Sequence, residues 1–134
     1  MTSTLTIKRP DDWHVHLRDG EVLKAVLPFT AEAFGRAIIM PNLKEPVTTT
    51  KRAVAYRDEI RTVTPKNADF TPLMVLYLTD ASNAEDFAQG HKEGIVTAAK
   101  LYPAHATTNS EHGVTDIKRI YPAPSPVPRE RSRP

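Results

Sequence analysis

The sequence contains no cysteine, and this absence excludes two kinds of structure. A small domain held together by disulfides is ruled out, and so is a metal site built on thiolates. A metal ion would have to be bound by histidine, by carboxylates or by a modified lysine. No apolar run approaches the ~18 residues of a membrane span, and the first residues show no basic segment followed by an apolar core. We therefore expect a cytoplasmic chain with no membrane partner.

Most of the chain also lacks the clustered positive charge of a nucleic-acid-binding protein. The 134 residues carry a net charge of +2, with a pI of about 9.0. Residues 118–134 hold five Lys/Arg and one Glu, which leaves residues 1–117 at −2. Because the basic excess lies only in this last segment, the sequence predicts no nucleic-acid partner.

Short apolar runs of β-prone residues are present, and they recur along the chain. They occupy residues 13–17, 37–40, 73–78 and 95–101. Helical periodicity separates most of these runs, and alternation of strand and helix is typical of βαβ units with a parallel sheet. A chain of 134 residues is long enough for one such domain but short for two. The sequence therefore predicts an α/β fold.

The helix predicted between the second and third runs has the clearest pattern. Its apolar stripe recurs every three or four residues, at Ala53, Tyr56, Ile60 and Val63. Either Thr48 or Thr49 should cap its N-terminus, and Pro65 should end it.

Two further helices are predicted with weaker signals. One places Ala84, Phe87, Ala88 and His91 on a shared face. Its candidate caps are Asp80 and Ser82, and its candidate terminators are Gly90 and Gly94. The other is a short helix over residues 22–29.

The composition changes abruptly near residue 118. Proline stands at every second position from Pro122 to Pro128, which removes the backbone donors that a helix or sheet needs. We expect two segments, a folded part at residues 1–118 and an extended, disordered tail at residues 119–134. A break in the reading frame of a longer gene is our hypothesis for the origin of this tail.

His14 and His16 are the first candidate site residues. Side chains two positions apart on a strand point to the same face, so both imidazoles can ligate one metal ion. The pair alone is a weak signal, because strands often carry two histidines on a solvated face. Arg18 continues the same period and adds a planar guanidinium that binds carboxylates. The three residues together suggest a metal site beside a carboxylate clamp.

Lys100 and Asn42 stand at the carboxyl ends of other predicted strands, where α/β folds place their ligands. Lys100 ends an apolar run, and it is either a lysine whose ammonium reaches solvent or a neutral amine that captures carbon dioxide as a carbamate. A carbamate is a carboxylate ligand that can bridge two metals. Asn42 is either a turn residue or a ligand of substrate. Thr107 and Thr108 lie in a polar loop of the kind that closes over a site.

These segments together resemble dihydroorotases of the compact bacterial type, in the amidohydrolase superfamily. The resemblance rests on DWHVHLRDG at residues 12–20, MPNL at 40–43, TAAKLYP at 97–103 and ATTNS at 106–110. It extends over residues 7–117. Hydantoinases and allantoinases share the two histidines and the lysine, but not the tryptophan, the LRDG continuation and the Thr-Thr loop together.

The resemblance implies a (β/α)8 barrel, of which this chain would hold the N-terminal part, about four βα units. It also implies a two-zinc hydrolase that interconverts N-carbamoyl-L-aspartate and dihydroorotate in pyrimidine biosynthesis. His14 and His16 would ligate one zinc, and the Lys100 carbamate would bridge both. Arg18 and Asn42 would bind the substrate carboxylate. Thr107 and Thr108 would belong to the loop that covers it.

Other parts of the family site have no counterpart in this sequence. The family's general-base aspartate and two further histidines would follow beyond residue 134, so we expect this chain by itself to be inactive and to hold one zinc weakly at most. His105 and Glu111 also add ionisable groups to the loop. Two alternatives remain open: a non-catalytic half-barrel that binds a full-length homologue, and a cyclic amidohydrolase of other substrate completed by a second chain. A homodimer of the family kind is possible.

Overall fold

The computed structural model describes residues 3–106 and 110–120, and the predicted tail beyond Ile120 lies outside them. Seven regular elements and a final 3-10 helix follow one another along the chain. They are β1 (Asp11–Val15), α1 (Gly20–Ala33), β2 (Arg36–Ile39), α2 (Thr50–Val63), β3 (Thr71–Tyr77), α3 (Ala84–Lys92), β4 (Val96–Lys100) and η1 (Ile117–Ile120). This strict alternation of strand and helix confirms the predicted α/β class. The predicted division at residue 118 stays a prediction.

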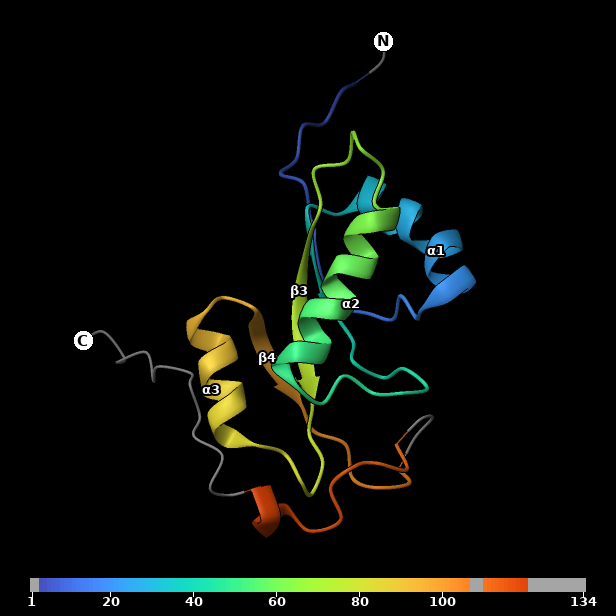
Figure 1. The fold of residues 1–134 in the computed structure, drawn as a ribbon. Coiled ribbons are helices and arrows are strands. Elements are labelled where there is room, and N and C mark those ends of the chain that lie inside the picture. The colour runs from blue at the N-terminus through green and yellow to red at the C-terminus, as the bar shows by residue number, and fades with distance from the viewer. Residues whose placement is uncertain (1–2, 107–109, 121–134) are drawn as a thin grey trace, which may run out of the picture.

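The four strands form one parallel sheet in the order β1-β2-β3-β4. Each strand therefore pairs with its neighbour in sequence, and a helix makes each crossover. Figure 1 shows α2 lying across β3, between α1 and α3. All four carboxyl ends consequently meet at one edge of the sheet, where the loops after the strands lie.

The core lies between the sheet and its helices. Leu23 and Leu27 of α1 are fully buried, and so are Tyr56 and Ile60 of α2. They pack in one cluster with the buried Met74 of β3. Burial of these side chains is the main force that holds the helices to the sheet. The stripe predicted for α2 is thus confirmed.

The ends of α2 agree with the prediction. Thr49 is its N-cap, and its side-chain oxygen accepts a hydrogen bond from the backbone N–H of Arg52 at 3.2 Å. Thr64 is its C-cap, with extended backbone, and Pro65 follows directly. The residue before a proline is disfavoured in helical conformation, which explains the stop.

The N-cap predicted for α3 is wrong. The cap is Asn83, whose Oδ1 accepts hydrogen bonds from the backbone N–H groups of Glu85 and Asp86. Asp80 and Ser82 lie just outside this turn, and their side chains accept hydrogen bonds from Thr115 and from the backbone of Thr79. Local sequence alone cannot rank three adjacent polar residues as caps.

One glycine of α3 ends the helix and the other lies inside it. Gly94 has a φ of +70° directly after the C-cap, so it is the terminator. Gly90 is buried within the helix, where an added Cβ would stand 2.3 Å from the hydroxyl oxygen of Thr50. A side chain there would push α3 away from the start of α2.

Helix α1 is longer than predicted. It runs over Gly20–Ala33 and continues past Pro28, although proline lacks an N–H for the helix ladder. Leu27 and Ala31 are fully buried on either side of this proline. Packing against the sheet therefore extends the helix beyond the 22–29 segment that local sequence indicates.

Strand β1 also departs from the prediction. It covers Asp11–Val15 rather than residues 13–17, and its register against β2 shifts between Asp12 and Val15. Leu17 lies after the strand and is fully buried. Arg18 has a φ of +59°, so it does not continue the strand period as expected. Among the described residues no helix is long and apolar enough to cross a membrane.

Candidate metal and carboxylate site

The two predicted histidines stand side by side at the carboxyl end of β1. The ring centroids of His14 and His16 are 5.3 Å apart, and their planes are inclined at 52°. His14 is exposed and its backbone N–H donates to the Asp12 carboxylate at 2.8 Å, whereas His16 is partly buried. The spacing fits two ligands of one metal ion.

Lys100 extends toward these histidines from β4, the strand at the other edge of the sheet. Its Nζ lies 3.3 Å from the Nε2 atom of His14, although the two residues belong to β4 and β1. The carbonyl of Lys100 accepts a hydrogen bond from Leu78 N–H at 2.9 Å, which fixes the end of β4 beside β3. The structure thus brings His14, His16 and Lys100 together, and their roles as metal ligands are part of the proposal below.

Burial lowers the pKa of His16 to about 4, and electrostatic repulsion from Arg18 and Lys100 acts in the same direction. Near neutral pH this imidazole is therefore uncharged. Its Nδ1 atom is buried and has no hydrogen-bond partner among the described residues. A buried nitrogen without a partner is costly, and a neutral imidazole is the form that binds metal ions.

We expect the free energy of unfolding of the metal-free chain to decrease as the pH falls from 6.5 toward 4. The unfolded chain takes up a proton on His16 near its ordinary pKa of 6.5, whereas the folded chain resists protonation down to about 4. Urea denaturation followed by circular dichroism at several pH values measures this. His16→Gln should flatten the profile in this range, and His112→Gln, at an exposed position, is the matched control. An unchanged profile for His16→Gln contradicts the assignment.

The predicted carboxylate clamp lies beside the histidines. Arg18 donates from its guanidinium to the carbonyl oxygen of Asn42 at 3.1 Å, and the Tyr56 hydroxyl donates to the carbonyl oxygen of Arg18 at 2.6 Å. Asn42 is only 2% exposed, yet neither side-chain polar atom has a partner among the described residues. A cation next to an unsatisfied buried amide is an arrangement that suits a carboxylate ligand.

Three residues of this region were missed at the sequence level. Met40 places its sulfur 2.9 Å from Lys100 Nζ, and Tyr102 places its ring centroid 4.5 Å from the same atom. Tyr56 holds the Arg18 backbone from α2. The only available signal was position, since Met40 directly precedes Pro41 at a strand end and Tyr102 lies two residues after Lys100. Thr107 and Thr108 lie outside the described residues.

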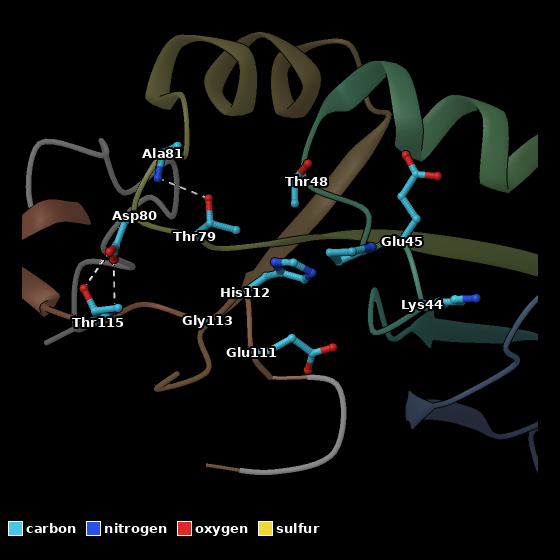
Figure 2. A pocket seen from close by; sticks show the side chains of 11 residues that line it. Lys44, Glu45, Thr48, Thr79, Asp80, Ala81, Glu111, His112, Gly113 and Thr115 are labelled. Carbon is cyan, nitrogen blue, oxygen red and sulfur yellow. Dashed lines mark hydrogen bonds between the residues drawn. The ribbon is translucent and has the colours of Figure 1, made fainter. Parts of the chain in front are cut away.

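A pocket of about 570 Å³ lies at the same edge of the sheet, between the loops that follow β2, β3 and β4. Figure 2 shows Asp80 and Thr115 paired at one side of it, and Glu45, Glu111 and His112 around it. None of the predicted metal or carboxylate ligands lines this pocket. Its wall mixes both signs of charge, so it does not indicate one class of ligand.

The donor set fits a metal ion only in part. Within residues 3–106 and 110–120, no three histidine or acidic side chains lie close enough together to hold a metal ion. A catalytic zinc site needs three protein ligands. His14 and His16 would be two of them, and Lys100 could be the third only in a modified form. The unpartnered Nδ1 of His16 and the contact of Lys100 with His14 favour this combination.

No family model matches the sequence, but curated proteins do. A dihydroorotase of Sphingopyxis alaskensis is 63% identical over 120 residues, which are 90% of this chain and 35% of that protein. One of Novosphingobium aromaticivorans is 62% identical over 122 residues, again 35% of its length. This chain is homologous to dihydroorotases. It spans about a third of the length of the curated dihydroorotases that it matches.

Solved structures agree with the sequence comparison. A dihydroorotase from Campylobacter jejuni superposes with a TM-score of 0.76 at 37% identity, over 85% of this chain and 33% of that chain. The Saccharomyces cerevisiae dihydroorotase in complex with 5-fluoroorotic acid gives a TM-score of 0.76 at 34% identity, over 84% and 31%. The four strands and three helices therefore correspond to the N-terminal part of the (β/α)8 barrel of dihydroorotases, as predicted.

Proposed function

We propose that this chain carries the first metal-ligand strand, the bridging lysine and the carboxylate clamp of a zinc-dependent dihydroorotase. The observation that carries the proposal is the contact between Lys100 Nζ and His14 Nε2, 3.3 Å across a four-stranded sheet. A lysine on β4 has no structural need to meet a histidine on β1, because both side chains could extend to solvent. The homology to dihydroorotases supports the same assignment.

In this proposal His14 and His16 bind zinc through neutral imidazole nitrogens. Lys100 attacks carbon dioxide with its uncharged amine, loses a proton to water and becomes a carbamate, which adds an anionic oxygen ligand. When bound by these residues, zinc would supply a nucleophile from water near neutral pH and would polarise the amide carbonyl. Arg18 and Asn42 bind the substrate carboxylate and orient the ring amide toward the metal ligands.

The substrates in this proposal are small molecules, N-carbamoyl-L-aspartate and dihydroorotate. Their carboxylates match the Arg18 guanidinium and the unpartnered amide of Asn42. The family-like homodimer stays a prediction.

The direct test is a chimera in which this chain replaces the matching 120-residue segment of the Sphingopyxis alaskensis dihydroorotase. We expect the chimera to convert dihydroorotate and carbamoyl-aspartate with a kcat/KM within about tenfold of the parent, since one tenfold step is only about 1.4 kcal/mol. Hydantoin and allantoin serve as competing substrates. A chimera that folds, binds zinc and prefers one of these would overturn the substrate assignment.

The 134-residue chain alone provides a second measurement. We expect no turnover, and at most one weakly bound zinc per chain, which His14→Ala should remove. Elemental analysis after dialysis against zinc and bicarbonate gives the stoichiometry. Two tightly bound zinc ions per chain would show that the described donors suffice without further ligands, against this proposal.

A further inference from the structure

The ring of Tyr102 lies against the end of the Lys100 side chain. The Lys100 Nζ is 4.5 Å from the ring centroid, within the range of a cation–π contact. Tyr102 also contacts Tyr77, with ring centroids 5.6 Å apart and planes inclined at 32°. Tyr77 is fully buried and pairs with Lys100 in the register of β3 and β4. Tyr102 therefore contacts both a buried residue of β3 and the Lys100 side chain.

The backbone of Tyr102 is also held in place. Its carbonyl oxygen accepts a hydrogen bond from Val114 N–H at 2.7 Å, and Ala104 N–H donates back to the Val114 carbonyl at 3.0 Å. Pro103 and Val114 form an isolated parallel bridge. Residues 102–104 thus pair with the segment that returns after the loop.

Asp80 ties this returning segment to the loop after β3. One carboxylate oxygen accepts from the backbone N–H of Thr115 at 2.8 Å, and the other accepts from the Thr115 hydroxyl and from Arg119 at 3.1 Å. These donors lower the pKa of Asp80, with the Thr115 hydroxyl as the largest cause. The carboxylate is charged near neutral pH, and we call this set of contacts the Asp80 clamp.

We propose that Tyr102 is a positioning residue that holds the Lys100 side chain toward His14, and that the Asp80 clamp holds Tyr102. A lysine side chain has four rotatable bonds, and an aromatic face that restricts them places Nζ where the metal ligands converge. The effect of this arrangement on zinc binding rests on the proposed function. The contact between Tyr102 and Lys100 does not depend on that proposal.

The contact is tested by NMR on the full chain labelled with ¹³C-lysine, without zinc or bicarbonate. The face of an aromatic ring shifts nearby protons upfield, so the Lys100 ε-methylene protons should lie upfield of those of the other lysines, and Lys100→Arg assigns them. Tyr102→Phe should keep the shift, and Tyr102→Leu should abolish it. Asp80→Ala, which removes the hydrogen bonds to Thr115, should reduce it. A wild-type Lys100 without an upfield shift overturns the proposal.

The consequence for zinc is measured by competition with a chromogenic chelator in the presence of bicarbonate. Tyr102→Leu should weaken zinc binding by about tenfold, as does loss of residues that orient metal ligands, while Tyr102→Phe should not. In a Lys100→Ala background, Tyr102→Leu should have no further effect, which distinguishes positioning from a general loss of stability. An equal loss in both backgrounds overturns the proposal. If the wild-type chain alone binds no measurable zinc, as the missing ligands allow, the NMR shifts alone decide the role of Tyr102.

Discussion

Replacing Tyr56 by alanine is expected to lower the free energy of unfolding by about 3–5 kcal/mol, the usual cost of truncating a buried aromatic side chain. Tyr56 is fully buried in the core between α2 and the sheet, beside Ile60 and Leu23. Its hydroxyl donates to the Arg18 carbonyl at 2.6 Å. Truncation would leave both a cavity and an unsatisfied carbonyl. Since small domains are stable by only about 5–15 kcal/mol, this variant should lose a large part of the free energy of unfolding and unfold at a clearly lower temperature.

Tyr56→Phe separates the hydroxyl from the ring. Burial raises the pKa of Tyr56 well above its usual value of 10, so the hydroxyl stays protonated and can donate at all ordinary pH values. Losing this one donor should cost about 1–2 kcal/mol. Urea denaturation followed by circular dichroism measures both variants. A loss below about 1 kcal/mol for Tyr56→Ala would show that this core tolerates the cavity, against the packing described above.

The second large effect is expected for Lys100→Ala in the chimera with the Sphingopyxis alaskensis dihydroorotase. Residues that only orient metal ligands already change activity by about 10–100-fold, so loss of a direct ligand should lower kcat/KM by more than about 100-fold. Zinc content should fall with it, because the variant lacks the carbamate oxygen. Steady-state kinetics on dihydroorotate and elemental analysis of the same preparation measure the two effects.

The matched control is Lys92→Ala, at an exposed position in the last turn of α3. It removes a lysine of the same charge from the same domain and should leave kcat/KM unchanged. If Lys100→Ala keeps both its activity and its zinc, Lys100 is not a metal ligand, and the contact with His14 has another role. If both lysine variants lose activity equally, the cause is loss of folding rather than of a ligand.

Elements with a periodic apolar pattern and clear end signals could be predicted from the sequence. Helix α2 is the best case, because its buried stripe, its Thr49 cap and its stop before Pro65 all follow from local physical chemistry. The convergence of Lys100 with His14 was also predictable. The resemblance to dihydroorotases implies one metal site for both residues, and parallel strands place their carboxyl ends at one edge of the sheet. The 3.3 Å contact itself joins the two outer strands, β1 and β4.

The N-cap of α3 and the length of α1 could not be predicted from the local sequence, because neighbouring groups compete for the same role. Asn83 caps α3 because Asp80, an equally good cap by residue type, is engaged by Thr115 from a loop 35 residues away. Helix α1 passes Pro28 because burial against the sheet outweighs the missing hydrogen bond. In both cases a contact that exists only in the folded chain outweighs a preference of the local sequence.

Residue types and their spacing were enough to predict the α/β class, the end of the strand that carries Lys100, and the homology to dihydroorotases. Those features depend on periodicity, on residue type and on motifs that are continuous along the chain. Two contacts became visible only in the folded chain: Arg18, with its positive φ, donates to the Asn42 carbonyl, and Met40 and Tyr102 both contact the Lys100 side chain. The physical reason is that side-chain contacts across a sheet depend on register and on bulges such as the shift in β1, which no local pattern specifies.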